Sequence, residues 1–128
     1  MHSLITYLLR KIMKPRSAKN KGVRLQNWVR DQILETFPKL TSDDVRPAIM
    51  GQSGMDINLS SEAQQIFPWA IECKNTERVR IWDAFDQAED NCPEGLNPLV
   101  IIKRNGSAPL AVLDAEFLLE HIGKLRSK

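Results

Sequence analysis

The spacing of hydrophobic positions changes several times along the chain, and each spacing predicts one kind of element. Apolar residues that recur every three or four positions predict helices, and these cover Met1–Met13, Gly22–Phe37, Val79–Asn91 and Ala115–Ile122. Alternating or continuous apolar runs predict strands, and these cover Val45–Met50, Met55–Leu59, Pro68–Asn75, Pro98–Lys103 and Ala108–Leu113. The order of these elements predicts an α/β fold with a mixed central β-sheet flanked by helices.

The segments between these elements are polar. Lys14–Lys21 has no apolar periodicity, so we expect a flexible basic arm there, and we expect a turn at Gly51–Gly54 and a polar connection at Ser60–Gln65. At the end of the chain, Asp114 is a candidate cap for the last helix, Gly123 is a candidate stop, and the basic tail after it is expected to fray. In the helix over 79–91 the predicted buried stripe is Ile81, Trp82, Phe85, Ala88 and Cys92.

The length of 128 residues fits one domain, which we divide into an amphipathic helix with a basic arm at 1–21 and a main domain at 22–128. The net charge of +2 identifies no partner, but residues 1–30 hold eight Lys or Arg and no Asp or Glu. Two cysteines are too few for a disulfide framework. This cysteine usage is typical of a reducing compartment, so we expect a cytoplasmic protein. No apolar run reaches the length of a membrane span.

Candidate chemistry gathers in one stretch, Met55–Lys74. In a strand over 68–75 successive side chains face opposite sides, so Glu72 and Lys74 share one face. Asp56 on the preceding strand adds a second carboxylate. Two carboxylates can hold a hard divalent cation through oxygen ligands, and a lysine beside them can orient a water or meet charge on a phosphate. The alternative is an ordinary exposed pair between Glu72 and Lys74.

In this stretch, Gly54-Met55-Asp56-Ile57-Asn58 followed by Trp69-Ala70-Ile71-Glu72-Cys73-Lys74 resembles the PD-(D/E)XK nuclease superfamily. The resemblance covers residues 20 to 113. It implies a restriction-endonuclease-like core in the order αβββαβ, here with an extra C-terminal strand and helix. It also implies Mg²⁺ as cofactor, with Mn²⁺ as a substitute and no other small-molecule cofactor.

By this resemblance Asp56, Glu72 and the backbone carbonyl of Cys73 would bind the metal, and Lys74 would be the catalytic lysine. Gln87, on the helix after the motif, is the candidate for a further polar residue facing the site; the alternative is a plain surface glutamine. One departure is Gln26, which occupies the position where the family's first helix often carries a glutamate. A glutamine is a poorer ligand for a hard dication.

Within the superfamily, a compact domain with a basic arm most resembles small phage and archaeal Holliday junction resolvases. The implied partners are branched or duplex DNA and a second copy of the chain, since two cuts need two sites. Basic residues in the arm, the helix after it and the segment after the motif are the candidates for contacts with the nucleic-acid backbone; they are Lys14, Arg16, Lys19, Lys21, Arg24, Arg78 and Arg80.

Two other classes of function stay open. The first is a DNA-binding protein that has the nuclease fold with weak or no catalysis, which Gln26 favours. The second is an interaction module in which the acidic face of Asp83–Asp90 docks a basic partner. A divalent-metal requirement separates the nuclease from both.

Overall fold

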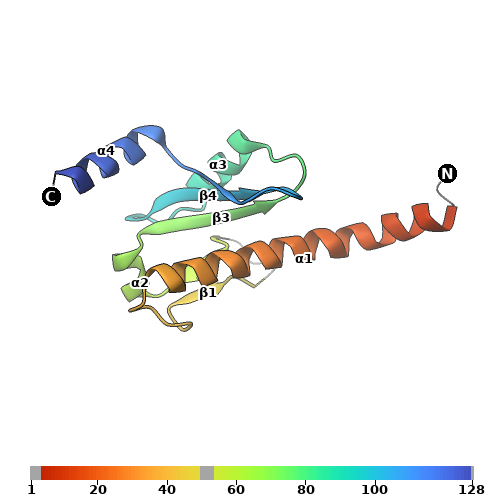
Figure 1. Ribbon diagram of the computed structural model, residues 1–128, viewed down its shortest axis with the longest axis horizontal. Coiled ribbons are helices and arrows are strands. Elements are labelled where there is room, and N and C mark those ends of the chain that lie inside the picture. Colours follow the sequence, from red (N-terminus) through yellow and green to blue (C-terminus); the bar gives the residue numbers. More distant parts are fainter. Residues whose placement is uncertain (1–3, 50–53, 128) are drawn as a thin grey trace.

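The computed structural model describes the backbone of residues 4–49 and 54–127, and the side chains of these residues except 5–16. Figure 1 shows a long helix along one side of a sheet and shorter helices on its other side and at its end. The elements in chain order are α1 (Leu4–Thr36), β1 (Val45–Pro47), β2 (Ile57–Leu59), α2 (Ser61–Ile66), β3 (Trp69–Asn75), α3 (Ile81–Asp90), β4 (Asn97–Lys103), β5 (Leu110–Val112) and α4 (Ala115–Arg126). The predicted α/β class is confirmed.

The strands pair in two groups. In the mixed sheet β3 is parallel to β4, with Glu72 opposite Val100, and β4 is antiparallel to β5, with Val100 opposite Val112. The other group is the antiparallel pair of β1 and β2. One backbone hydrogen bond joins the groups, because the Asp56 N–H donates to the Ile71 carbonyl at 2.9 Å. Residue 56 therefore lies against the free edge of β3.

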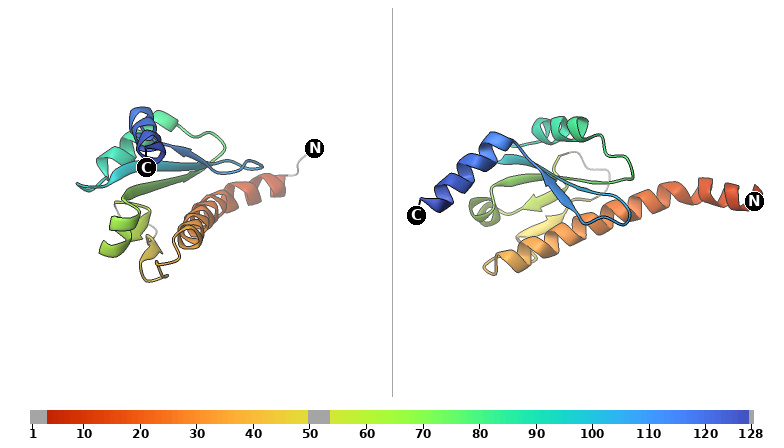
Figure 2. Two further views of the ribbon diagram at one scale, coloured as in Figure 1. Left: turned by 60° about the vertical axis from the view of Figure 1, so that its left-hand side comes forward. Right: turned by 45° about the horizontal axis from the view of Figure 1, so that its top comes forward.

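Helices cover both faces of the mixed sheet (Figure 2). On one face Leu25, Val29 and Ile33 of α1 pack in a buried cluster with Ile71 and Leu99. On the other face Ala84 and Ala88 of α3 pack against Val100 in a second cluster. The connection from β3 through α3 to the parallel strand β4 is a βαβ unit, the arrangement that parallel pairing requires.

The segment Lys14–Lys21 is not a flexible arm, because α1 continues through it without a break. Extending a helix that is already formed costs far less than starting one, and Lys, Arg and Ala are good helix formers. The packed part of α1, with Leu25 and Val29 on the sheet, is therefore joined to a helical extension that needs no apolar periodicity of its own. The division of the chain at residue 21 stays a prediction.

A second correction concerns the segment after β2, which was expected to be a polar connection and is the helix α2. The hydroxyl oxygen of Ser60 accepts a hydrogen bond from the Ala63 N–H at 3.1 Å, which is an N-cap. Ala63 is fully buried in the core of α1, β1 and β2. A cap together with one buried alanine is enough to form a helix of six residues, which is too short for a spacing pattern to reveal.

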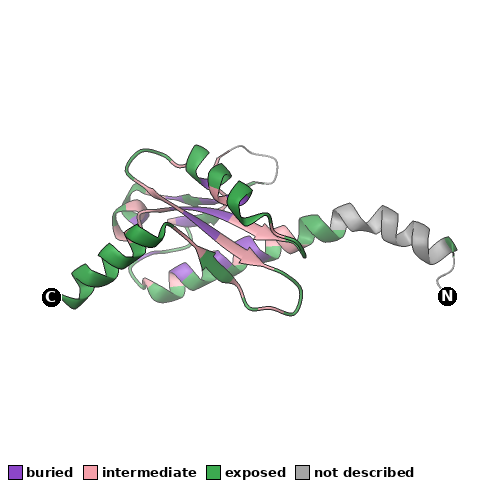
Figure 3. Cartoon of the chain, turned by 90° about the horizontal axis from the view of Figure 1, so that it is seen from above, coloured by how far each residue is buried: buried purple, intermediate pink, exposed green. Residues whose placement is uncertain are grey.

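The last helix, α4, begins at the predicted residue but ends later than expected. Gly123 does not end α4, which runs to Arg126; a mid-helix glycine costs about 1 kcal/mol, and Lys124 and Arg126 offset it by lying in the last turn, where cations favour the helix dipole. Asp114 does cap α4, since its carboxylate accepts from the Phe117 N–H at 2.9 Å. Figure 3 shows α4 exposed along its length.

In α3, Ile81 and Trp82 are not part of the buried stripe, and Trp82 is 83% exposed. Residues in a helix advance by about 100°, so Trp82 lies about 200° round the axis from Ala84. Because Ala84 and Ala88 take the contact with the sheet, Trp82 faces the opposite way. Residues 50–53 lie outside the described part of the chain. They include the end of the predicted strand over 45–50 and most of the predicted turn at 51–54.

Candidate active site at the edge of β3

The strand β3 presents two chemically different faces. Ile71 and Cys73 belong to the cluster under α1. Glu72 is opposite Val100, which packs under α3, so Glu72 and Lys74 lie on the α3 face. Glu72 is only 4% exposed. The alternation predicted from the sequence thus places a buried carboxylate and a lysine on one face of β3, an edge strand of the mixed sheet.

Asp56 is held against the edge of β3 by its backbone and its side chain. Its N–H donates to the Ile71 carbonyl at 2.9 Å, and its carboxylate oxygen Oδ2 accepts from the Cys73 N–H at 2.6 Å. The side chain therefore takes a position that a neighbouring strand's carbonyl would occupy. This fixes the carboxylate beside Glu72.

The electrostatics of the pair are unfavourable for two negative charges. The pKa of Asp56 is raised above its ordinary value, first by burial of the carboxyl. The pKa of Glu72 is also raised, first by burial and then by the charge of Asp56. Hydrogen bonds from the Cys73 N–H to Asp56 and the charge of Lys74 act in the other direction without cancelling the rise. The two carboxyls are close enough to hydrogen-bond, so they favour either a shared proton or a cation.

Lys74 is the cation that the structure provides at this site. Its Nζ lies 3.5 Å from Glu72 Oε1, and it donates to Gln87 Oε1 at 2.9 Å. The Lys74 side chain is one-third exposed while that of Glu72 is buried. The ammonium group therefore stands between the buried carboxylate and solvent. The structure brings Gln87 of α3 to this group, as the sequence suggested; a role in catalysis stays a prediction.

The donor set fits a hard divalent cation. The Cys73 carbonyl lies on the same strand edge as the Cys73 N–H that contacts Asp56, because the N–H and C=O of one strand residue point the same way. Burial raises the pKa of the Cys73 thiol, which keeps the sulfur protonated and unsuited to metal binding. Magnesium typically uses one or two protein carboxylates and completes its shell with water and phosphate oxygens.

Within residues 4–49 and 54–127, no group of three or more His, Cys, Asp or Glu side chains has the arrangement of a closed metal site. The pair Asp56 and Glu72 is thus a site with only two carboxylates. Such a site leaves positions for water and substrate oxygens, which suits a catalytic cation better than a structural one.

Gln26 is buried, at 7% exposed, on α1. It and Glu72 are the two polar residues that are buried in the described part of the chain. The neighbouring Leu25 packs in the core with Ile71, which places Gln26 on the helix that covers β3. Whether Gln26 contributes to a metal site stays a prediction.

Two of the predicted nucleic-acid contacts lie next to Lys74. Arg78 and Arg80 line a recess of about 240 Å³ together with Lys74 and Gln87. Arg80 Nε lies 3.3 Å from Asp83 Oδ2, in a pair that is largely exposed and so contributes little to stability. A phosphate that approaches Lys74 would therefore meet two further guanidinium groups.

The other predicted contacts lie on α1. Lys21 Nζ is 3.5 Å from Glu77 Oε1, and Lys19 and Arg24 are exposed. The side chains of Lys14 and Arg16 fall outside the described residues. The structure thus brings Lys21 to the carboxyl end of β3, while Lys19 lies further along the helix.

Sequence reasoning missed the residues that tie this end of the sheet together. Glu77 accepts from the Asn105 N–H at 2.9 Å as well as pairing with Lys21, and its pKa is lowered, first by that backbone hydrogen bond. Lys103 Nζ donates to the carbonyls of Arg104 and Ser107. The sequence signals this region only through Asn105-Gly106, a pair typical of a tight turn, since the partners are far apart along the chain.

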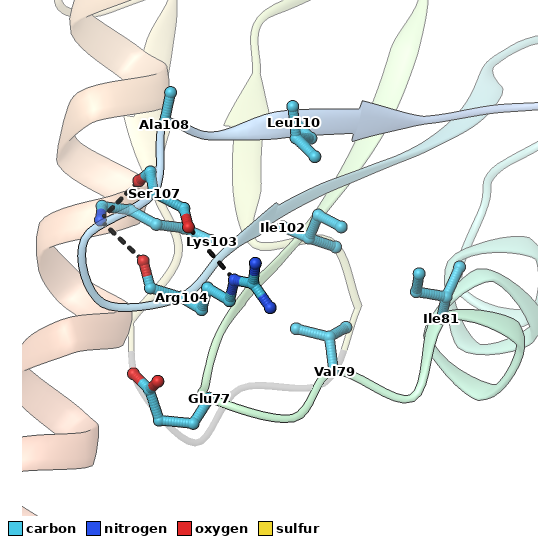
Figure 4. A pocket seen from close by; sticks show the side chains of 9 residues that line it. All are labelled: Glu77, Val79, Ile81, Ile102, Lys103, Arg104, Ser107, Ala108 and Leu110. Carbon is cyan, nitrogen blue, oxygen red and sulfur yellow. Dashed lines mark hydrogen bonds between the residues drawn. The ribbon is translucent and has the colours of Figure 1, made fainter.

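A hollow of about 340 Å³ adjoins these residues (Figure 4). Its rim carries Glu77, Lys103 and Arg104, and its interior is apolar, with side chains of Val79, Ile81, Ile102 and Leu110. The rim hydrogen bonds of Lys103 and Arg104 hold the turn between β4 and β5. The Ser107 hydroxyl in this hollow accepts a hydrogen bond from Arg104 Nε at 3.1 Å, and the lining holds a single carboxylate, Glu77. The carboxylate pair lies elsewhere, at Asp56 and Glu72.

Comparisons with protein-family models, with curated proteins and with solved structures find no match to this chain. Among the described residues no helix has the length and apolar character needed to cross a membrane. The function therefore has to be inferred from the geometry of the site.

Proposed function

We propose that the chain is a metal-dependent DNA endonuclease of the PD-(D/E)XK type that hydrolyses phosphodiester bonds. The observation that carries this proposal is the pair Asp56 and Glu72, two carboxyls held together at a strand edge with raised pKa values and with Lys74 beside them. A fold keeps such a costly arrangement where it serves a function.

The proposed cofactor is Mg²⁺, with Mn²⁺ as a substitute. Asp56, Glu72 and the Cys73 carbonyl would hold it. When bound, a divalent cation lowers the pKa of a water and polarises a phosphoryl oxygen. Lys74 orients the attacking water or stabilises negative charge at the phosphate. Gln87 keeps the Lys74 ammonium in position through its 2.9 Å hydrogen bond.

The arrangement of elements supports a restriction-endonuclease-like core. One carboxylate, Asp56, lies directly before β2, and the other, Glu72, lies on β3. The helix α3 connects β3 to the parallel strand β4, and α1 covers the opposite face. This follows the order αβββαβ, with α2 inserted and with β5 and α4 added at the C-terminal end.

The proposed substrate is DNA, branched or duplex, cut in the manner of a Holliday junction resolvase acting as a homodimer. Arg78 and Arg80 support it, because guanidinium groups in the same recess as Lys74 suit phosphate oxygens. Backbone contacts of this kind position DNA without reading its sequence, which suits an enzyme that selects structure.

A second candidate is a DNA-binding protein that keeps this fold without cleavage. Gln26 favours it, since this buried amide replaces the glutamate expected on the first helix. In that case the carboxylates would still be close together, but they would not assemble an active site.

Cleavage of labelled DNA tests the proposal. A four-way junction, a duplex of the same sequence and a single strand are incubated with Mg²⁺, Mn²⁺ or EDTA, using wild type and Lys74→Ala. We expect metal-dependent cleavage that falls about 10²- to 10³-fold in Lys74→Ala. Glu89→Gln, an exposed change on the same helix as Gln87, is the control and should retain full activity.

Metal-dependent cleavage that persists in Lys74→Ala would overturn the assignment of the site. Binding of the junction without cleavage of any substrate, in wild type with either metal, would replace the nuclease by the second candidate. Paired symmetric cuts confined to the junction would identify a resolvase.

A further inference from the structure

On the α1 side of the sheet, a second hollow has a tryptophan in its lining. Its volume is about 400 Å³, and it lies between α1, the end of β3 and the turn between β4 and β5. The lining residues are Lys21, Arg24, Leu25, Trp28, Asn75, Lys103, Asn105, Gly106 and Pro109. We call it the Trp28 hollow.

The position of the Trp28 hollow relative to the candidate active site follows from β3. Asn75 lines the hollow and comes directly after Lys74, and successive strand residues face opposite sides. The hollow and Lys74 are therefore on opposite faces of the same strand end. A strand of nucleic acid that passes round this end can contact both.

Trp28 is the unusual member of the lining. It lies between the buried residues Leu25 and Val29 on α1 but is itself 42% exposed. Leu25 and Pro109 supply an apolar lining beside it. A large indole face next to an open polar hollow is the kind of surface on which a nucleic-acid base stacks.

The charges in the Trp28 hollow suit a phosphate. Arg24 is exposed and forms no ion pair with any described residue. Lys103 donates to two backbone carbonyls and forms no ion pair with any described residue. Lys21 Nζ pairs with Glu77 Oε1 at 3.5 Å. The side-chain amide nitrogen of Asn75 donates to the Lys21 carbonyl at 2.9 Å, which fixes this wall of the hollow.

We propose that the Trp28 hollow binds one unpaired nucleotide of the DNA substrate, with the base stacked on Trp28 and the adjoining phosphate on Arg24 and Lys103. This inference rests on the proposed function and adds a substrate class to it. In a duplex each base is already stacked between its neighbours, and exposing it costs unstacking energy. Single-stranded or branched DNA offers such a base freely, so the hollow selects those substrates.

The test is binding without cleavage. Fluorescence anisotropy is measured in EDTA with a labelled oligothymidylate and with a labelled duplex of equal length. Trp28→Ala is expected to weaken binding of the single strand about 5- to 150-fold, the range for losing one stacked base, and to leave duplex binding within about twofold. Trp28→Phe keeps an aromatic face and should lose much less.

Trp82→Ala is the matched control, because Trp82 is more exposed than Trp28 and does not line the hollow; it should bind the single strand as wild type does. Trp28→Leu keeps apolar packing on α1 without a ring face, and it replaces Trp28→Ala if thermal unfolding shows that the alanine variant does not fold. Arg24→Ala should weaken both DNAs, since it removes a phosphate contact.

Equal losses for single strand and duplex in Trp28→Ala, or no loss for either, would overturn the proposal. The proposal would also be overturned if free thymidine monophosphate displaced the oligothymidylate at a concentration equal to the one at which oligothymidylate half-saturates the protein. That result would indicate a site for free mononucleotides. Because EDTA prevents metal-dependent cleavage, these outcomes are independent of the cleavage assay. If Trp28→Ala selectively loses single-strand binding and wild type cleaves no DNA, the nucleotide-binding site stands and the proposed nuclease function is wrong.

Discussion

The carboxyl of Asp44 and the carboxyl pair of Asp56 and Glu72 differ in how folding changes their pKa values. Asp44, before β1, accepts hydrogen bonds from the Thr41 N–H at 2.8 Å and from the Ser60 hydroxyl at 2.7 Å. Its pKa is lowered, first by the backbone hydrogen bond. Asp56 and Glu72 are buried next to each other, and their pKa values are raised, first by that burial.

The difference shows where the fold gains stability and where it gives some up. Asp44 links the turn before β1 to the cap of α2, and its charged form is favoured by folding. The charged forms of Asp56 and Glu72 are disfavoured by folding, and Lys74 offsets this only in part. A protein keeps a pair of this second kind where a bound cation or a reaction uses the charge.

The largest effect is expected at Glu72, where a substitution should reduce cleavage without reducing stability. Glu72→Gln keeps the size of the side chain and removes one of the two carboxylates, so cleavage should fall at least about 100-fold. Folding should not suffer, because the buried charge is gone. Cleavage of the junction and thermal unfolding by circular dichroism measure the two outcomes; a large loss of stability with little loss of cleavage would contradict the account.

Gln87→Ala should give a smaller loss of cleavage, about 10- to 100-fold, which is typical for a residue that orients a functional group. Its side chain holds Lys74 Nζ at 2.9 Å. Because Gln87 is exposed, the thermal midpoint should hardly change. Rates at saturating and limiting DNA are compared, and an effect on DNA affinity alone would show that Gln87 binds substrate instead of positioning Lys74.

Asp44→Ala should show the reverse pattern, with a lower thermal midpoint and unchanged cleavage at a temperature where the variant is folded. It removes the acceptor for both the Thr41 N–H and the Ser60 hydroxyl. Asp43→Ala is the control, because Asp43 pairs only with Arg46 in the described structure and both side chains are largely exposed. Equal midpoints for the two variants would mean that the hydrogen bonds of Asp44 contribute nothing.

The smallest expected effect is the pH dependence of that stabilisation. The pKa of Asp44 is lowered in the fold from an ordinary value of 3.8, so the unfolded chain binds its proton first. The contribution is therefore fully present above that ordinary value and is lost as the pH falls through the lowered pKa. Urea unfolding of wild type and Asp44→Ala should differ at pH 6 and converge in acid; a constant difference would exclude this origin.

Much of the site could be predicted from the sequence because its parts are local or follow strand alternation. Glu72 and Lys74 are two positions apart in one strand, so their shared face follows from geometry. Gln87 is a candidate because of the resemblance to PD-(D/E)XK nucleases, and its contact with Lys74 joins residues 13 positions apart. The contact that holds Asp56 could not be predicted, since the Cys73 N–H of β3 donates to the Asp56 side chain and not to the carbonyl of a neighbouring strand.

The rest depends on contacts between distant segments. The cap at Ser60 defines α2, which apolar spacing over six residues does not reveal. The helix α1 continues through Lys14–Lys21 because extending a formed helix costs little. The polar composition of this segment gives no apolar spacing from which the helix could be predicted. The Trp28 hollow forms only where α1 meets the Asn105-Gly106 turn. Helical spacing alone cannot distinguish Trp28 from the core residues Leu25 and Val29 of the same helix.

Burying Asp56 and Glu72 side by side should lower the stability of the metal-free protein. The most direct test is thermal unfolding of wild type and Asp56→Asn, in EDTA and with Mg²⁺. Asparagine keeps an oxygen that can accept from the Cys73 N–H but carries no charge. In EDTA the variant should unfold at a higher temperature than wild type, and Mg²⁺ should raise the wild-type midpoint more than that of the variant. A lower midpoint for Asp56→Asn in EDTA, with an equal response of both proteins to Mg²⁺, would contradict the claim that this pair exists to hold a cation.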